Sequence, residues 1–253
     1  MVKRRFAGWL ILTALLAGTA PAVQAAAPVG QVSAAGRFVS KADIPAAVAL
    51  GAGPNDTLVA DSAVGEVSIY ESQFDREPAD TMSNPTHEGV LLLFSVLKQE
   101  GNWLEVRLPK RPNGSTGWIK TSDVRIRKVP NRIVIDRSDN TLQALRGEEV
   151  LLEASVGVGL DSTPTPLGQF YVDISVPFQD TGGPYGAYML SVAGYSEVLT
   201  NFGGGNGQIA IHGTNNRGSV GIQSSNGCLR MYNEDILELK ELAPTGTPVE
   251  IVA

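Results

Sequence analysis

The chain has 253 residues and a formal net charge of −6, which is enough length for one large or two small domains. The acidic balance and the lack of a basic patch argue against a nucleic-acid partner. Glycine is frequent, at 28 residues, proline contributes 15, and the single cysteine leaves no internal disulfide, so we expect a mainly β fold held by hydrophobic cores.

Residues 1–25 have the pattern of a secretory signal peptide. Basic residues at positions 3–5 precede an apolar run from Phe6 to Gly18, and small residues close the segment. These parts match the n-region, the apolar core and the cleavage site of such a signal. The apolar run is shorter than the about 20 residues that a membrane-spanning helix needs. We therefore predict an exported protein of the periplasm or cell wall, with no stable membrane span after cleavage; an uncleaved anchor is the alternative.

Residues 26–62 are rich in alanine, glycine, proline and valine and have no clear periodicity. Such a composition is typical of a linker. We interpret the segment as a connection between the signal peptide and a first folded domain at residues 63–128.

Residues 63–128 contain several short strand candidates separated by turns. The stretch from Trp103 to Leu108 alternates apolar and polar side chains, which is typical of a half-buried strand. Asn113-Gly114 marks the tip of a hairpin loop. The other strand candidates are residues 67–70, 91–97 and 117–120. This spacing of short strands predicts a small barrel.

Two runs in this domain, residues 101–109 (GNWLEVRLP) and 112–119 (PNGSTGWI), resemble a bacterial SH3-like domain. The resemblance implies that the domain contacts cell-wall material or packs on a neighbouring catalytic domain. We interpret Trp103 and Trp118 as residues of the barrel core rather than as wall-binding residues. His87 lies in a polar loop and is interpreted as a solvated histidine.

Residues 129–253 form the second predicted domain. Its expected strands are residues 132–136, 141–145, 150–156 and 247–252. The prolines of the run Thr163-Pro164-Thr165-Pro166 exclude a helix and fix an extended segment that leads into another strand. Tyr185 and Tyr188 lie at a glycine-rich loop that enters a strand, and each is open to interpretation as a pocket or a core residue. Residues 233–242 have apolar side chains at helical spacing, which predicts a short amphipathic helix.

The strongest candidate for chemistry is the pair formed by His212 and Cys228, the only cysteine. An apolar strand at residues 208–211 ends at His212, and a polar, glycine-rich loop leads back to Cys228. A thiol needs a nearby base to become a thiolate at neutral pH, and imidazole has a suitable pKa. Gly227 permits the unusual backbone conformation that an oxyanion-binding turn needs. A small buried cysteine and a structural histidine are the alternatives.

Two further features bear on this cysteine. The residues after Cys228 have a helix-start pattern, and the N-terminus of that helix is expected to stabilise a thiolate. His212 and Cys228 have no third or fourth ligand at zinc spacing. We therefore expect a thiol site with no metal and no other cofactor.

Two motifs of the chain resemble a known family. The first is His212-Gly213-Thr214 followed, after a loop, by Ser225-Asn226-Gly227-Cys228-Leu229-Arg230-Met231. The second is the Thr-Pro-Thr-Pro-x-Gly-x-Phe run at residues 163–170. Both are similar to motifs of the L,D-transpeptidase (YkuD-type) catalytic domain. One position departs from the pattern, because Asn226 stands where the family usually has a second histidine. An asparagine amide donates a hydrogen bond but cannot take a proton, so the base role rests on His212 alone.

The resemblance implies a mainly β fold, with a small SH3-like barrel followed by a β-rich catalytic domain that has a short helix after the catalytic cysteine. It implies that Cys228 is the nucleophile and His212 its base, with the backbone carbonyl of Gly213 orienting the imidazole. The backbone N–H groups of Gly227 and Cys228 are the expected oxyanion donors. The expected substrate-binding residues are Ser225, Asn226, Arg230, Tyr185 and Tyr188. For Arg230, a structural salt bridge is the alternative to binding a stem carboxylate.

The implied function is peptidoglycan L,D-transpeptidation. The thiolate attacks the carbonyl that precedes the terminal D-Ala of a tetrapeptide stem, and the thioester passes to an acceptor amine to give a 3–3 cross-link. Peptidoglycan stem peptides are then the partners, and carbapenem-type lactams the expected inhibitors. Two other functions remain open: an L,D-carboxypeptidase of the same fold, and a non-catalytic cell-wall-binding protein.

Overall fold

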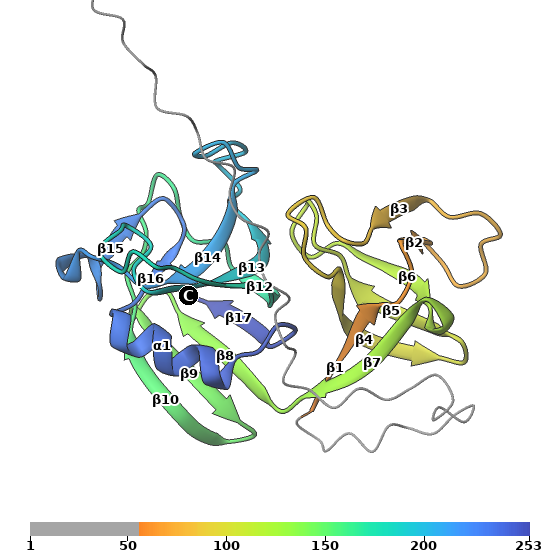
Figure 1. Ribbon diagram of the computed structural model, residues 1–253, viewed down its shortest axis with the longest axis horizontal. Coiled ribbons are helices and arrows are strands. Elements are labelled where there is room, and N and C mark those ends of the chain that lie inside the picture. Colours follow the sequence, from red (N-terminus) through yellow and green to blue (C-terminus); the bar gives the residue numbers. More distant parts are fainter. Residues whose placement is uncertain (1–55) are drawn as a thin grey trace, which may run out of the picture. The chain divides into compact units, whose positions relative to one another are not determined.

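The fold is taken from a computed structural model, which describes residues 56–253. The predicted signal peptide and most of the predicted linker lie outside the described residues. The described residues belong to one compact unit of the chain and are mainly β, with one α-helix among them. We call Thr57–Val129 the N-terminal β-region and Asn131–Val252 the C-terminal β-region, after the two larger sheets that they form (Figure 1).

The N-terminal β-region contains a five-stranded antiparallel sheet in the order β6-β5-β4-β1-β7. Its strands are β1 (Thr57–Ser62), β4 (Leu93–Glu100), β5 (Trp103–Arg107), β6 (Thr116–Lys120) and β7 (Val124–Val129), with a 3₁₀ turn at Thr121–Asp123. A separate antiparallel pair consists of β2 (Glu66–Ile69) and β3 (Asp80–Ser83). The resemblance of this region to an SH3-like barrel stays a prediction.

The first strand corrects the predicted extent of the linker. Residues 57–62 fall within the predicted linker at 26–62, but they form β1, which pairs with β4 on one side and with β7 on the other. The sequence of β1, TLVADS, shows no clear alternation because Val59 and Ala60, which are neighbours, are both buried. A strand that is covered on both faces lacks the period of two that identifies half-buried strands.

The two tryptophans of this region lie outside its core, in contrast to the prediction. Side chains alternate between the two faces of a strand, and the inward positions of β5 and β6 belong to Leu104, Val106 and Ile119. Trp103 and Trp118 are therefore half-buried on the opposite face, where Lys120 lies 5.6 Å from the centroid of the Trp103 ring. His87 is exposed in its loop, as predicted.

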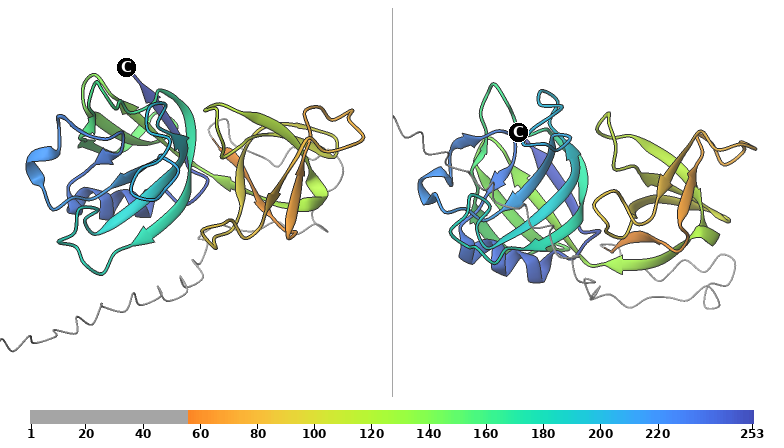
Figure 2. Two further views of the ribbon diagram at one scale, coloured as in Figure 1. Left: turned by 90° about the horizontal axis from the view of Figure 1, so that it is seen from above. Right: turned by 45° about the horizontal axis from the view of Figure 1, so that its top comes forward.

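The C-terminal β-region contains an eight-stranded sheet in the order β10-β9-β8-β17-β12-β13-β14-β16. Its strands are β8 (Asn131–Asp136), β9 (Thr141–Arg146), β10 (Glu149–Ser155), β12 (Gly168–Pro177), β13 (Tyr188–Tyr195), β14 (Gln208–His212), β16 (Leu229–Arg230) and β17 (Pro248–Val252). The pairs β8–β17 and β14–β16 are parallel and the others antiparallel. The sheet is strongly curled, as the two further views in Figure 2 show. A small parallel pair, β11 (Val158–Gly159) with β15 (Gln223–Ser225), and a 3₁₀ turn at Arg217–Ser219 complete the region.

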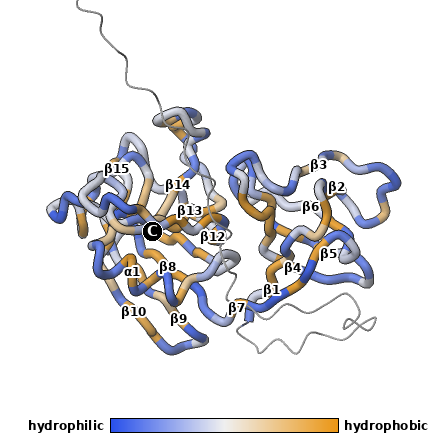
Figure 3. The backbone as a smooth tube through the Cα atoms, viewed as in Figure 1, coloured by the Kyte–Doolittle hydropathy of each residue, from blue (hydrophilic) through white to orange (hydrophobic). Residues whose placement is uncertain are grey.

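The single α-helix of the described residues, α1 (Asn233–Leu242), has the bounds that the sequence predicted. Its apolar positions Ile236 and Leu239 are fully buried and join a core with side chains of the curled sheet. The hydropathy of the chain follows this packing, with apolar residues concentrated on the strands and polar residues in the loops (Figure 3). The helix packs against β13, β10 and β14, and β14 ends at His212.

A buried ion pair links β1 to β7. Arg127 donates from Nε to Asp61 at 2.8 Å and from Nη2 to the same carboxylate at 3.2 Å, and both side chains are 3% exposed. Arg127 Nη2 also donates to the Thr245 hydroxyl of the C-terminal β-region at 3.3 Å. Burial raises the pKa of Asp61, and the hydrogen bond and charge of Arg127 oppose that rise.

We expect Arg127→Met to lower the free energy of unfolding by about 3–5 kcal/mol at pH 7, because it leaves the Asp61 carboxylate buried without its partner. Chemical denaturation measures the loss. Arg125→Met is the matched control, because Arg125 lies on the same strand but is exposed. An equal, small loss for both variants would contradict the expectation.

Candidate active site

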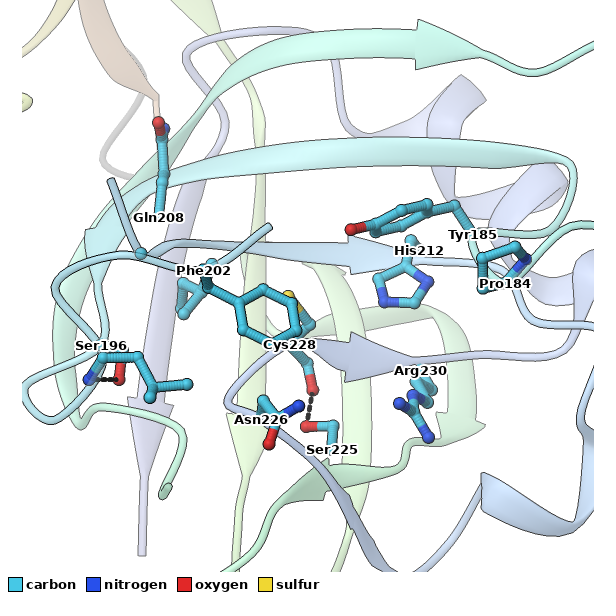
Figure 4. Close-up of a pocket in the computed structure, with 13 residues that line it drawn as sticks. Pro184, Tyr185, Ser196, Phe202, Gln208, His212, Ser225, Asn226, Cys228 and Arg230 are labelled. Carbon is cyan, nitrogen blue, oxygen red and sulfur yellow. Dashed lines mark hydrogen bonds between the residues drawn. The ribbon is translucent and has the colours of Figure 1, made fainter. Parts of the chain in front are cut away.

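The parallel pairing of β14 with β16 brings His212 and Cys228 together. In the observed register Ile211 lies opposite Leu229 and His212 opposite Arg230, so Cys228 is level with the residue before Ile211. Both side chains line a pocket of about 260 Å³ (Figure 4). The other residues that line it are Pro184, Tyr185, Ser196, Leu199, Phe202, Gly207, Gln208, Ile209, Ser225, Asn226 and Arg230.

His212 is held in one orientation and is neutral at pH 7. Its Nδ1 lies 2.5 Å from the carbonyl oxygen of Gly213. A carbonyl only accepts, so Nδ1 carries the proton and Nε2 keeps a free lone pair. The Tyr185 ring packs edge-on against the imidazole, with 4.9 Å between ring centroids. Burial lowers the pKa of His212 to about 4, because the charged imidazolium loses its hydration. The geometry is that of a base ready to accept a proton at Nε2.

Gly213 is required at its position by the close approach of α1. A Cβ on Gly213 would lie 2.3 Å from Asn233 Oδ1. The same Asn233 oxygen accepts a hydrogen bond from the backbone N–H of Ala187 at 3.0 Å, and the Gly213 N–H donates to the Tyr188 carbonyl at 3.0 Å. The first residue of α1 thus holds the loop before β13 against the loop after His212. The sequence marked Asn233 only as the start of a helix and gave no sign of this contact.

Cys228 is half-buried, and its thiol is protonated at pH 7 in the free protein. Burial raises the pKa of Cys228, whereas a backbone hydrogen bond from Ala210 and the charge of Arg230 have smaller effects in the opposite direction. The expected stabilisation by a helix N-terminus is wrong, because strand β16 follows the cysteine and α1 begins only at Asn233. Burial is instead the largest influence on the pKa of this thiol.

The turn from Ser225 to Cys228 corrects two predicted roles. The Ser225 hydroxyl donates to the Cys228 carbonyl at 2.5 Å and accepts from the Gly227 N–H at 3.1 Å. The N–H of Gly227 is thus engaged inside the turn and is not free to act as the predicted oxyanion donor. Ser225 is 2% exposed, so it shapes the turn instead of presenting its hydroxyl to substrate. Gly227 has φ +114°, a conformation that residues with a side chain rarely adopt.

The Thr-Pro-Thr-Pro run supports this turn from behind. The fully buried Thr165 accepts from the N–H of Gly159 at 2.9 Å and donates to the Gly227 carbonyl at 3.0 Å. The Thr163 hydroxyl donates to the Ser225 carbonyl at 3.3 Å. The sequence identified these prolines as a rigid lead-in to a strand, but it did not identify the threonines as anchors of the cysteine turn.

The remaining predicted binding residues divide between the pocket and the protein interior. Asn226 is exposed in the pocket, and Tyr185, 41% exposed, stacks on Phe178 at a centroid distance of 5.8 Å. Tyr188 points away from the pocket: its hydroxyl bonds to that of Ser175 at 2.8 Å, and its ring packs against the core. Of the two roles left open for Tyr188, the structure therefore favours the core residue, on the side of β13 that faces α1, where Lys240 lies 5.1 Å from its ring centroid.

Arg230 lines the pocket without an acidic partner. Its Nη1 donates to the Ser224 carbonyl at 3.1 Å, and none of the ion pairs found within residues 56–253 includes this side chain. The structural salt bridge considered as its alternative role is therefore not formed here. The guanidinium lowers the pKa of both His212 and Cys228 through its charge.

One wall of the pocket comes from a loop that the sequence did not single out. We call residues 196–207, which connect β13 to β14, the pocket loop. It contributes Ser196, Leu199 and Phe202 to the lining, and the Phe202 ring is 48% exposed beside Cys228 (Figure 4). The only sequence signal was the glycine-rich stretch after Phe202, which lacks any chemistry-bearing residue.

Comparison with known proteins defines the class to which this site belongs. The family model of the L,D-transpeptidase catalytic domain, YkuD, matches residues 130–251. The putative L,D-transpeptidase YkuD of Bacillus licheniformis is 37% identical over 123 residues, which is 49% of this chain and 66% of that protein. The putative L,D-transpeptidase YqjB of Bacillus subtilis is 31% identical over 122 residues, 47% of this chain and 69% of that protein. The chain belongs to the L,D-transpeptidase (YkuD) family.

A more distant similarity is found among solved structures. The LD transpeptidase LdtMt1 in complex with imipenem is 16% identical, over 59% of this chain and 90% of that chain, with a TM-score of 0.39. Within residues 56–253 no helix is long and apolar enough to cross a membrane. The same part of the chain holds no group of three or more histidine, cysteine, aspartate or glutamate side chains placed to bind a metal ion.

Because burial keeps the thiol protonated, we expect iodoacetamide to alkylate Cys228 slowly at pH 7. The rate should rise with a single inflection above about pH 8.5, the usual pKa of a thiol. Intact mass follows the reaction without ambiguity, since Cys228 is the only cysteine, and Cys228→Ala is the control. A rate that is already at its plateau at pH 6–7 would instead indicate a preformed thiolate–imidazolium pair.

Proposed function

We propose that the C-terminal β-region is a peptidoglycan L,D-transpeptidase in which Cys228 carries the acyl group and His212 moves the protons. One observation supports this function above the others: a neutral His212, with Nε2 free and Nδ1 bonded to the Gly213 carbonyl, shares a pocket with the only thiol of the chain. The matched region spans only 66% of the Bacillus licheniformis relative. The activity and the substrate are therefore proposed from the residues of this chain and are not transferred from that protein.

In the first half-reaction the thiol proton moves to His212 Nε2 as Sγ attacks the carbonyl carbon that precedes the terminal D-Ala of a tetrapeptide stem. The tetrahedral intermediate collapses when the C–N bond to D-Ala breaks, and His212 returns the proton to the leaving amine. The product is a thioester on Cys228. In the second half-reaction an amine of another stem attacks the thioester, gives its proton to His212 and releases the free thiol.

The developing oxyanion needs donors in the turn that carries Cys228. The Gly227 N–H is engaged with Ser225, so we assign this role to the backbone N–H of Cys228, with the exposed Asn226 amide as a second donor. A preorganised donor of this kind is typically worth about 2.7–4 kcal/mol in the transition state. Arg230, which faces the pocket without an acidic partner, is suited to bind a stem carboxylate.

Two assignments made from the sequence enter the proposal unchanged. The signal-peptide pattern of residues 1–25 supports export to the periplasm or cell wall, where the stem peptides are found. The N-terminal β-region is proposed to be an SH3-like domain because residues 101–109 and 112–119 resemble the sequence of that domain.

The activity should persist well below the usual pKa of histidine. His212 must be neutral to accept the thiol proton, and the pKa of His212 is about 4 in the free protein, compared with about 6.5 for an unperturbed imidazole. We therefore expect kcat/KM to fall only as the pH drops through about 4, where His212 becomes protonated. The measurement is the pH profile of kcat/KM on a tetrapeptide stem. An acid limb near 6.5 would show that His212 is not the base, or that it is not buried.

The decisive experiment tests the thiol and the reaction in turn. After incubation with a carbapenem, intact mass should show one lactam adduct on the wild-type protein and none on Cys228→Ala. Incubation with tetrapeptide stems should then release D-Ala and yield a cross-linked dimer. A tripeptide alone would identify the carboxypeptidase, since water then resolves the thioester. A folded protein that forms no adduct and releases no D-Ala would overturn the proposal in favour of a non-catalytic wall-binding protein.

A further inference from the structure

The pocket loop has few internal restraints of its own. Its base is closed by the hydrogen bond from the Ser196 N–H to the Gly207 carbonyl at 2.8 Å. Its tip is held by the reciprocal backbone bonds of Phe202 and Gly205, at 3.0 and 2.9 Å. Between base and tip lies Leu199, whose N–H donates to the Ser196 hydroxyl at 3.0 Å. The position of the apolar pocket wall therefore depends on what holds the loop from outside.

A single guanidinium of the N-terminal β-region holds this loop. Arg111, from the loop between β5 and β6, donates from Nη1 to the Ser196 carbonyl at 2.6 Å. Its Nη2 donates to the carbonyls of Leu199 at 3.2 Å and of Asn206 at 3.0 Å. The three acceptors come from both limbs of the pocket loop. The planar guanidinium has several N–H donors in fixed directions, so it can donate to all three carbonyls at once. The single ammonium of a lysine has no such fixed arrangement of donors.

The segment that carries Arg111 is itself fixed on the C-terminal β-region. The Asn113 side chain donates to the Tyr195 carbonyl at 2.7 Å and accepts from the Tyr195 N–H at 2.9 Å, as a neighbouring strand would do. The Tyr195 hydroxyl donates to the Pro109 carbonyl at 2.7 Å, and the Arg111 guanidinium lies 5.1 Å from the centroid of the Tyr195 ring. Arg111 is thereby directed at the loop that follows Tyr195.

Gly207 shows how closely the loop is drawn around the guanidinium. A Cβ on this residue would lie 1.9 Å from the Leu199 carbonyl oxygen and 2.9 Å from Arg111 Nη2. Its φ of +77° is also a conformation that favours glycine. Only a residue without a side chain lets the two limbs of the loop and the arginine meet at this point.

We propose that Arg111 is a positioning residue for substrate binding: by binding the three carbonyls it sets where Leu199 and Phe202 stand beside Cys228. This inference rests on the proposed function and deepens it. It makes the N-terminal β-region part of the site that binds the tetrapeptide stem from which D-Ala leaves. The wall that Arg111 fixes faces the apolar parts of the stem peptide. The reacting atoms at His212 and Cys228 are untouched by Arg111, so the residue acts on binding and not on the chemical step.

The test compares Arg111→Ala with Lys110→Ala in the full chain. Lys110 is the matched control, since it precedes Arg111 in the same loop but pairs with Asp80 at 2.7 Å. We expect Arg111→Ala to speed hydrogen exchange of the 196–207 amides roughly tenfold and to raise KM for a tetrapeptide stem about tenfold, with kcat changed less than about threefold. Exchange in β8 and β9, which Arg111 does not contact, should stay at the wild-type values. Lys110→Ala should behave as wild type.

Arg111→Lys keeps the charge without the fork and is the second variant, in case the alanine variant does not fold. It should lie between wild type and Arg111→Ala in both exchange and KM. Unchanged loop exchange in both arginine variants would overturn the proposal, and so would faster exchange with an unchanged KM. The exchange measurement needs no turnover. A wild-type protein that forms no product therefore refutes the proposed function separately from the contact between Arg111 and the loop.

Discussion

Strand β16 is two residues long, and its pairing with β14 sets the distance between the side chains of His212 and Cys228. His212 ends β14, and Cys228 immediately precedes β16. A parallel pair needs a connection outside the sheet, and here the connection is the glycine-rich loop between the two residues. A slip of one residue in this register would turn Cys228 to the opposite face. Three side chains near the pair help to keep this register. Thr165 bonds to the cysteine turn from behind, Ser225 bonds within the turn, and Asn233 at the start of α1 holds the loop before β13.

Burial determines the charge state of the pair. The desolvation that lowers the pKa of His212 also raises that of Cys228, so both groups are uncharged at rest. Such a site holds its proton on sulfur until an electrophile arrives, and the base then takes the proton as the new bond forms. The charge of Arg230 lowers both pKa values, which favours a neutral imidazole and a more acidic thiol. A neutral resting pair also protects the thiol from oxidation, because the thiolate is the reactive form.

The pocket is assembled from segments that lie far apart in the sequence. The turn with Cys228, the loop with Tyr185 and the pocket loop each supply part of the lining. Each segment is held by side chains that take no part in the chemistry, and for the pocket loop the holding residue belongs to the N-terminal β-region. The two β-regions also share a buried contact, in which the Tyr171 hydroxyl donates to the Leu93 carbonyl at 3.1 Å. The N-terminal β-region thus contacts the loop that forms one wall of the pocket.

The sequence by itself determined the elements with a clear period and the residues with distinctive chemistry. The helix at Asn233–Leu242, the strands with alternating side chains and the pairing of one histidine with one cysteine were all visible, because local pattern encodes them. The tertiary structure alone decided which way each side chain faces and which polar groups are already occupied. Trp103 and the Gly227 N–H were misplaced for this reason, Tyr188 was left undecided, and Thr165, Asn233 and Arg111 were missed. Their roles depend on hydrogen bonds to backbone atoms distant in the chain, and a backbone carbonyl has the same chemistry at every residue, so no sequence pattern marks it.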